Sequence, residues 1–160
     1  MNYRFNIVEG NILSYISKAD AICVTTNGIV KHNGELVMGA GVAKTFANKY
    51  TDLPKKLGAM VKEKGNIVHC AMYDDITAIL SFPTKHNYKD KSDLDLIIRS
   101  AKQLAIWAEL NNADKVYLPS PGTGLGGLDK EVVYDALNYI LDERFTIMNY
   151  TPTGYNVVKG

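Results

Sequence analysis

The chain has 160 residues, of which 46% are hydrophobic and 22% charged, and its formal net charge at pH 7 is +1. This composition is typical of one globular domain that buries its own core, and not of a fibrous or membrane-spanning chain. A nearly balanced charge gives no general electrostatic argument for nucleic-acid binding, so any such binding would need a local basic patch.

The cysteines and the first residues of the chain bear on the cellular compartment of the protein. Cys23 and Cys70 each lie in an apolar run, where a free thiol acts as a small hydrophobic group, and neither has metal-ligand spacing. No segment approaches membrane-spanning length, and the first residues lack the apolar core of a signal peptide. We therefore expect a cytoplasmic monomer with no membrane partner, no metal and no cofactor.

The first half of the chain is typical of an α/β protein. Residues 3–8 and 21–25 have the apolar, β-rich pattern of strands, and Asn11 is a plausible cap for a short helix between them. The turn signals Asn27-Gly28 and Asn33-Gly34 predict a small excursion in which residues 29–30 return through residues 36–37. Gly39 and Gly41 then precede a helical pattern.

The second half repeats the alternation of helices and strands. We predict helices over 53–64, from a capping-box-like start at 92–95 through 108, and over 132–141, and strands over 66–72, 77–82 and 145–148. Trp107 lies just off the apolar stripe of its helix and is expected to pack. The whole chain is expected to form a single domain, with a core of about 3–149 and a short tail over 150–160.

A glycine-rich loop follows the apolar run 116–118. It holds Gly122, Gly124, Gly126 and Gly127, and a helical segment begins directly after it. Glycines let consecutive backbone N–H groups converge on an anion, and the start of a helix adds a favourable dipole. We interpret the loop as a phosphate cradle. Gly39 and Gly41 predict a second cradle at the same edge of the sheet, beyond the carboxyl ends of the strands.

Two familiar nucleotide motifs are excluded by layout. Gly122, Gly124 and Gly127 match the dinucleotide pattern G-x-G-x-x-G, but the loop comes too near the end of the chain for the acidic residue and further βα units that follow that pattern. No Lys-Ser or Lys-Thr follows the glycines, so the loop is not a Walker motif either.

Four motifs together resemble a known family. In chain order they are ADAICVTTN, MGAGVAKTF, FPTK and PSPGTGLGGLD, and they are similar to the motifs of macrodomains, the ADP-ribose-binding modules. The resemblance covers roughly residues 5–148 and is greatest to the branch that contains the DNA ADP-ribosyl glycohydrolase antitoxins and the protein-glutamate ADP-ribosyl hydrolases. It implies a three-layer α/β/α fold with a central mixed sheet.

The resemblance also implies a set of ligand contacts. Asp20 would accept a hydrogen bond from the adenine amino group, Asn27 would face the distal ribose, and the two glycine loops would enclose the diphosphate. The ligand-binding residues expected on this basis are Asp20, Ala21, Ile22, Asn27, Gly39, Ala40, Gly41, Val42, Ser120, Pro121, Gly122, Thr123, Gly124, Leu125 and Gly126.

Lys85 and Asn27 are the expected catalytic residues. Lys85 ends the FPTK motif, and the matching lysine of the antitoxin-like branch engages the anomeric C1″ of the distal ribose. An amine can do this when a desolvating pocket lowers its pKa. Asn27 would hold an ordered water. In the protein-glutamate hydrolases a loop aspartate assists the lysine, but Gly126 stands at that position here, and Asp129 is better placed to cap a helix.

The predicted function is therefore hydrolysis of an ADP-ribosyl linkage, with release of ADP-ribose from a modified macromolecule. Two alternatives stay open: an ADP-ribose 1″-phosphate phosphatase (Appr-1-p processing) and a non-catalytic reader of ADP-ribose. The acceptor is DNA, RNA or protein, and the basic run of Lys85, Lys89 and Lys91 would suit a nucleic-acid backbone. His32 and His86 are available as proton carriers but are more typical of loop histidines.

Overall fold

The computed structural model describes residues 2–149, so the expected tail over 150–160 lies outside the described residues. None of the helices within this range is long and apolar enough to cross a membrane. In chain order the elements are β1 (Asn6–Glu9), η1 (a 3-10 helix, Ile12–Tyr15), β2 (Ala21–Thr26), α1 (Gly41–Lys49), α2 (Leu53–Lys64), β3 (Cys70–Asp74), β4 (Thr77–Pro83), α3 (Leu94–Leu110), β5 (Val116–Pro119), α4 (Lys130–Leu137) and β6 (Phe145–Asn149).

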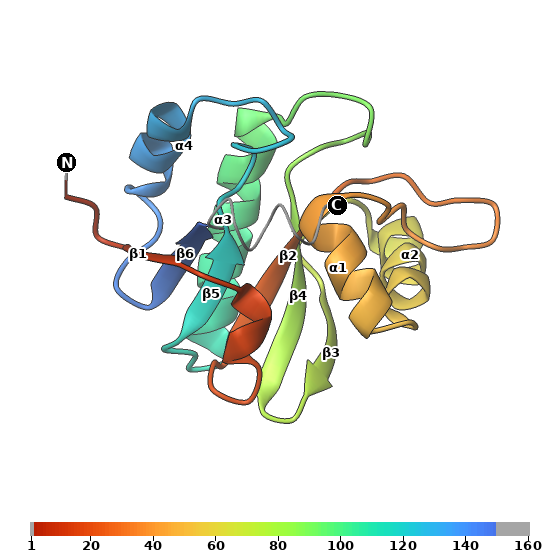
Figure 1. The fold of residues 1–160 in the computed structure, drawn as a ribbon, viewed down its shortest axis with the longest axis horizontal. Coiled ribbons are helices and arrows are strands. Elements are labelled where there is room, and N and C mark those ends of the chain that lie inside the picture. Colours follow the sequence, from red (N-terminus) through yellow and green to blue (C-terminus); the bar gives the residue numbers. More distant parts are fainter. Residues whose placement is uncertain (1, 150–160) are drawn as a thin grey trace.

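The strands form one mixed sheet in the order β1-β6-β5-β2-β4-β3 (Figure 1). Every neighbouring pair is parallel except β3 and β4, which are antiparallel. The strand β2 lies between β5 and β4, so the chain must cross over it by way of α3. This order brings the carboxyl ends of β2, β4, β5 and β6 to the same edge of the sheet.

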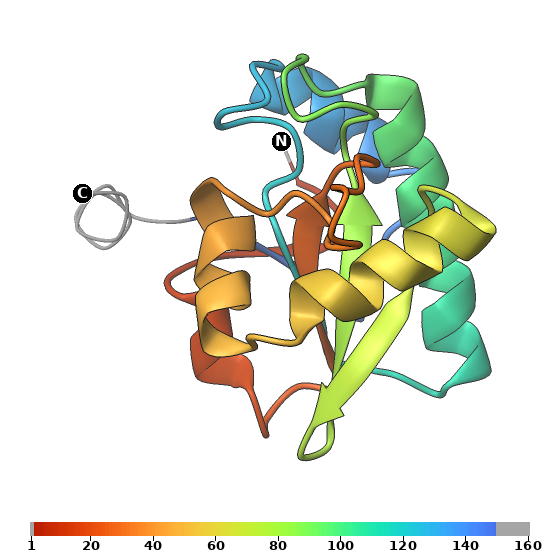
Figure 2. The same ribbon diagram turned by 90° about the vertical axis from the view of Figure 1, so that its right-hand side faces the viewer.

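Helices cover both faces of the sheet, with α1 and α2 on one face and α3 and α4 on the other (Figure 2). The sequence of β2 explains why both faces are buried. Ala21 and Cys23 pack into the core beneath α3 and α4, whereas Ile22 and Val24 pack into the core beneath α1 and α2. Successive side chains of a strand point to opposite faces, so a continuous apolar run fills two cores. The expected three-layer α/β/α architecture is confirmed.

Most predicted elements are found, with shifts at several ends; for example, the first strand is Asn6–Glu9 rather than 3–8. Helix α2 has the predicted bounds, and the excursion between β2 and α1 closes by an antiparallel bridge from Val30 to Leu36. The strand β3 begins at Cys70 rather than at 66, and the N–H groups just before it donate to side chains: Val68 N–H to Gln103 Oε1 and His69 N–H to Ser81 Oγ. Asp93, not Ser92, caps α3, and α4 ends at Leu137 before one further turn that buries Leu141.

Candidate functional site

A cavity of about 780 Å³ opens where the parallel strands end. Its wall is made by residues at the carboxyl ends of β2, β4, β5 and β6 and by the loops that follow them. Ligands of open α/β sheets bind at this edge, where the order of the strands reverses about a central strand. The residues that line it are Thr25, Thr26, Asn27, Val37, Met38, Gly39, Ala40, Gly41, Val42, Ala43, Thr84, Lys85, Tyr88, Ser92, Pro119, Ser120, Gly122, Thr123, Gly124, Leu125, Gly126, Lys130, Met148 and Asn149.

The first glycine loop ends in the start of α1. Ala40 is the N-cap and makes no side-chain capping bond, and Gly41 has a positive φ of 57°. The first N–H groups of an α-helix have no partner within the helix, so those of α1 are available to a ligand in the cavity. Gly39, Ala40, Gly41 and Val42 all line the cavity, in agreement with a cradle for an anion.

The second glycine loop presents a longer run of unbonded donors. Within residues 2–149, the backbone N–H groups of residues 122–126 make no hydrogen bond to an acceptor. The loop is closed behind them by two bonds, Gly127 N–H to Gly124 O at 3.2 Å and Leu128 N–H to Gly122 O at 2.9 Å. Gly122 has a positive φ of 74°, which a residue with a side chain would adopt only with strain. Such a run of amides is suited to a phosphate group.

Position 126 has no room for a side chain. A Cβ atom there would overlap Ser92 Oγ and lie 2.7 Å from the carbonyl oxygen of Gly122. Asp129 caps α4, because its carboxylate accepts a hydrogen bond from Glu131 N–H at 2.9 Å. The prediction that Asp129 is an N-cap is confirmed, and neither position supplies an aspartate to assist Lys85.

Lys85 lies on the wall of the cavity just beyond the end of β4. Its backbone N–H is 3.4 Å from Thr26 O, and its carbonyl accepts a hydrogen bond from Asn66 Nδ2 at 2.9 Å. The side chain is half-buried, and among residues 2–149 no carboxylate lies within 4 Å of its amine. The structure therefore brings Lys85 to the same cavity as both glycine loops, with its amine unpaired in that range.

Asn27 also lines the cavity, but its side-chain amide has an internal role. Nδ2 donates to Val37 O at 2.8 Å, and Oδ1 accepts from Ile29 N–H at 2.9 Å. These bonds fasten both ends of the excursion that carries the first glycine loop. The residue is 8% exposed. One Nδ2 hydrogen is left for a ligand or a water.

The structure does not place Asp20, Ala21 and Ile22 at the cavity. Asp20 precedes β2, whereas the cavity lies beyond the other end of that six-residue strand, roughly 20 Å away at the rise of a β-strand. The carboxylate of Asp20 instead accepts hydrogen bonds from the N–H groups of Asp114 and Lys115, at 2.8 and 3.0 Å. The expectation that Asp20 contacts the ligand at this cavity is therefore wrong. Pro121 is buried beside the cavity without lining it.

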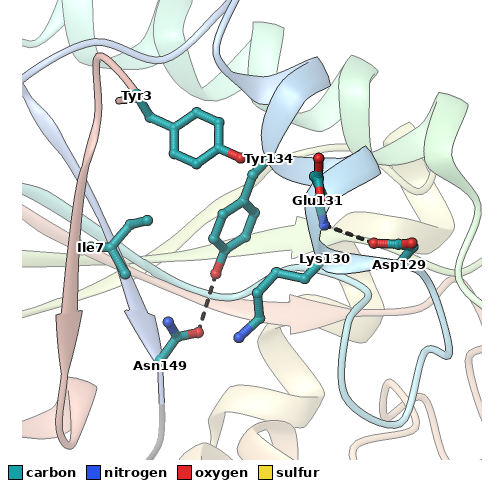
Figure 3. A pocket seen from close by; sticks show the side chains of 7 residues that line it. All are labelled: Tyr3, Ile7, Asp129, Lys130, Glu131, Tyr134 and Asn149. Atoms are coloured by element: carbon teal, nitrogen blue, oxygen red, sulfur yellow. Dashed lines mark hydrogen bonds between the residues drawn. The ribbon is translucent and has the colours of Figure 1, made fainter. Parts of the chain in front are cut away.

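A second, smaller cavity of about 590 Å³ lies next to the first (Figure 3). Lys130 and Asn149 line both cavities. Between them, the Tyr134 hydroxyl donates to Asn149 Oδ1 at 3.1 Å and lies 2.8 Å from Ser120 Oγ. Burial raises the pKa of Tyr134, which keeps its hydroxyl protonated. This chain of bonds fixes the start of the second glycine loop to the end of β6.

Sequence reasoning missed several residues of the wall. Some of them, such as Thr84 and Thr26, directly precede residues that the motifs did select, so their places follow from the strand ends. Ser92, Lys130 and Asn149 carry no local signal, because only the strand order brings them to the cavity. Neither His32 nor His86 lines it. His86 instead pairs with Asp93 at 2.8 Å, and this hydrogen bond lowers the pKa of the Asp93 carboxyl.

Comparison of the sequence with protein-family models gives no match, and neither does comparison with curated proteins. Comparison with solved structures does give matches. The macrodomain of Thermus aquaticus DarG has a TM-score of 0.72 and 25% identity, over 92% of this chain and 98% of that one. The macrodomain of Mycobacterium tuberculosis DarG has a TM-score of 0.73 and 24% identity, over the same shares of the two chains.

A third structure of the same kind carries a ligand. It is Thermosipho africanus DarTG in complex with ADP-ribose, with a TM-score of 0.70 and 20% identity, over 90% of this chain and 41% of that one. The chain therefore has the macrodomain fold, as the four motifs predicted, and it is similar in structure to macrodomains of DarG.

Proposed function

We propose that the 780 Å³ cavity binds ADP-ribose and that the protein hydrolyses an ADP-ribosyl linkage, releasing ADP-ribose from a modified macromolecule. The observation that carries the proposal is that Lys85 shares one cavity with the start of α1 and with residues 122–126, whose backbone N–H groups have no acceptor within residues 2–149. The structural similarity to DarTG in complex with ADP-ribose supports the same ligand.

The two loops would hold the diphosphate, because unbonded amides and the start of α1 favour an anion. With the diphosphate fixed between them, the distal ribose would extend toward Lys85 at the end of β4. The bond from C1″ to the acceptor breaks with its electron pair leaving on the acceptor as positive charge develops on the ribose, a water oxygen bonds to C1″, and the proton that the water loses passes to the departing acceptor. The loops stabilise the anion beside that charge, and Lys85 engages C1″. The proposal assigns no step to a metal or cofactor.

Turnover tests the proposal directly. The purified protein is incubated with ADP-ribosylated DNA, ADP-ribosylated protein and ADP-ribose 1″-phosphate, and released ADP-ribose or phosphate is measured. We expect release from a macromolecule, and a loss of at least about a hundredfold in rate for Lys85→Ala, in the range typical of a group that acts on the reacting bond. Lys89→Ala is the matched control, since Lys89 is exposed on the same loop and does not line the cavity.

A non-catalytic reader of ADP-ribose is the second candidate. It is favoured by one observation: position 126 has no space for a side chain and Asp129 is occupied as a helix cap, so the lysine has no carboxylate partner in the second loop. Calorimetry separates the candidates. Binding of ADP-ribose without turnover of any of the three substrates would establish the reader, and absence of binding by the folded protein would overturn both.

A further inference from the structure

Ser92 Oγ is a buried hydroxyl with no hydrogen-bond partner among the described residues. Ser92 lies directly before α3, lines the cavity and is 7% exposed. Another buried serine, Ser100 on α3, has its hydroxyl satisfied by Pro83 O at 2.7 Å. Leaving a buried hydroxyl unpaired costs free energy, so an unpaired one beside a binding cavity calls for an explanation.

Ser92 touches the second glycine loop at two places. Its N–H donates to Gly126 O at 3.0 Å, and its hydroxyl occupies the space that a side chain at 126 would need. Its Cβ lies 3.1 Å from where a Cβ of Gly122 would be. The hydroxyl therefore faces the backbone of the five residues whose N–H groups are unbonded.

The geometry of the peptide group links these two observations. In a trans peptide the N–H and the C=O point in opposite directions. When the N–H groups of residues 122–126 turn toward an anion in the cavity, the carbonyl oxygens of the same peptides turn away from it, toward the protein. Ser92 Oγ is the unpaired donor against which the loop packs.

We propose that Ser92 is a positioning residue whose hydroxyl donates to a carbonyl of residues 121–125 when the N–H groups of residues 122–126 bind the diphosphate. The inference rests on the proposed binding of ADP-ribose. Among residues 2–149 of the free protein the hydroxyl lacks an acceptor, whereas in the complex it has one, so it favours the arrangement of the loop that holds the ligand. The hydrogen bond from Asp93 N–H to Thr84 O, at 2.9 Å, closes the loop over 84–93. Both Lys85 and Ser92 lie within this loop.

The test compares Ser92→Ala with the matched control Ser100→Ala. Each variant is measured for its thermal midpoint without ligand and for its calorimetric Kd for ADP-ribose. For Ser92→Ala we expect an unchanged or higher midpoint, because an unpaired hydroxyl is removed, and a Kd weakened by about three- to tenfold, the range of one net hydrogen bond. For Ser100→Ala, which loses a bond made in the free protein, we expect a lower midpoint and an unchanged Kd.

Opposite signs for stability and affinity are the signature of the proposal, since a merely structural serine would lower the midpoint when truncated. Wild-type binding together with equally tight binding by Ser92→Ala overturns the inference and leaves the proposed function standing. A lowered midpoint for Ser92→Ala also overturns it, because the hydroxyl would then have a partner in the free protein. If the wild-type protein binds no ADP-ribose, the proposed function fails and this inference fails with it.

Discussion

Single residues at the cavity divide into those that are bonded within the protein and those that are not. The side chain of Asn27 holds the excursion over 28–37 and keeps one Nδ2 hydrogen for a ligand, and Asp129, which lines the smaller cavity, caps α4. The amine of Lys85 and the N–H groups of residues 122–126 have no such partners within residues 2–149. The donors available to a ligand are thus mostly backbone amides, which is why glycine is required where the backbone must come close.

Gly126→Ala tests the fit of the second loop. A Cβ at 126 would overlap Ser92 Oγ, so the loop has to move and its amides leave their places. We expect the Kd for ADP-ribose to weaken by about tenfold or more, as for the loss of one to two hydrogen bonds to a charged group. Gly124→Ala is the control, because a Cβ there meets nothing within 4 Å. Equal Kd values for the two variants in calorimetry would contradict this account.

At the scale of elements, the loops after the strands are held by a few side chains placed at the strand ends. Asn27 follows β2 and bonds to both arms of the excursion over 28–37, and Asp93 precedes α3 and bonds to Asp95 N–H and to His86. These contacts fix the excursion over 28–37 and the loop over 84–93 that carries Lys85, so they serve the geometry of the cavity as well as stability.

Asn27→Ala should both destabilise the protein and weaken binding. The substitution leaves Val37 O and Ile29 N–H without partners, which corresponds to a loss of about 1–3 kcal/mol in the free energy of unfolding. Urea unfolding measures this loss. Asn33→Ala, at an exposed turn of the same excursion, should cost less and leave the Kd for ADP-ribose unchanged. An Asn27→Ala protein as stable as wild type would show that the excursion is held by other contacts.

The pairing of His86 with Asp93 predicts a dependence of stability on pH. The hydrogen bond from His86 lowers the pKa of Asp93 below its usual 3.8, so its contribution to stability is complete above that value and is lost as the pH falls through the lowered pKa. Asp93→Ala should therefore be less stable than wild type at pH 7, by about 1 kcal/mol for the lost helix cap, and the difference should shrink below about pH 4. Denaturant titrations at pH 7 and pH 3 check this.

For the whole molecule, the cavity depends on the complete sheet, because its wall combines the ends of four strands that are far apart in the sequence. A ligand held by all of them binds only the folded chain and stabilises it by mass action. At ADP-ribose concentrations of about 100 times the Kd, the free energy of unfolding should rise by about 2.7 kcal/mol. Thermal shift measures this rise.

Adenosine is the matched comparison for that measurement. It lacks the diphosphate, so it makes no use of the amides of the two glycine loops and should give a clearly smaller shift at the same concentration. Equal shifts with adenosine and ADP-ribose would mean that the glycine loops do not bind the diphosphate.

The sequence by itself determined the elements and the chemistry of the loops. The apolar run of β2, the pattern of α2 and the caps at Asn11 and Asp129 are local features, and the structure has them as predicted. The two glycine loops were also found from the sequence, since strand-loop-helix order indicates which end of a strand a loop leaves from, and Lys85 was found from the resemblance of its FPTK motif to macrodomains. The structure brings all three to one cavity.

Only the tertiary structure decided which residues outside those loops share the cavity. Asp20 was misplaced because it precedes β2, whereas the cavity lies beyond the carboxyl ends of the parallel strands. Ser92, Lys130 and Asn149 reach the wall because β4, β5 and β6 all end at the same edge of the sheet, with β2 between β4 and β5. Sequence patterns report local hydrogen bonding and burial, whereas the order in which strands pair depends on contacts between segments distant in the chain.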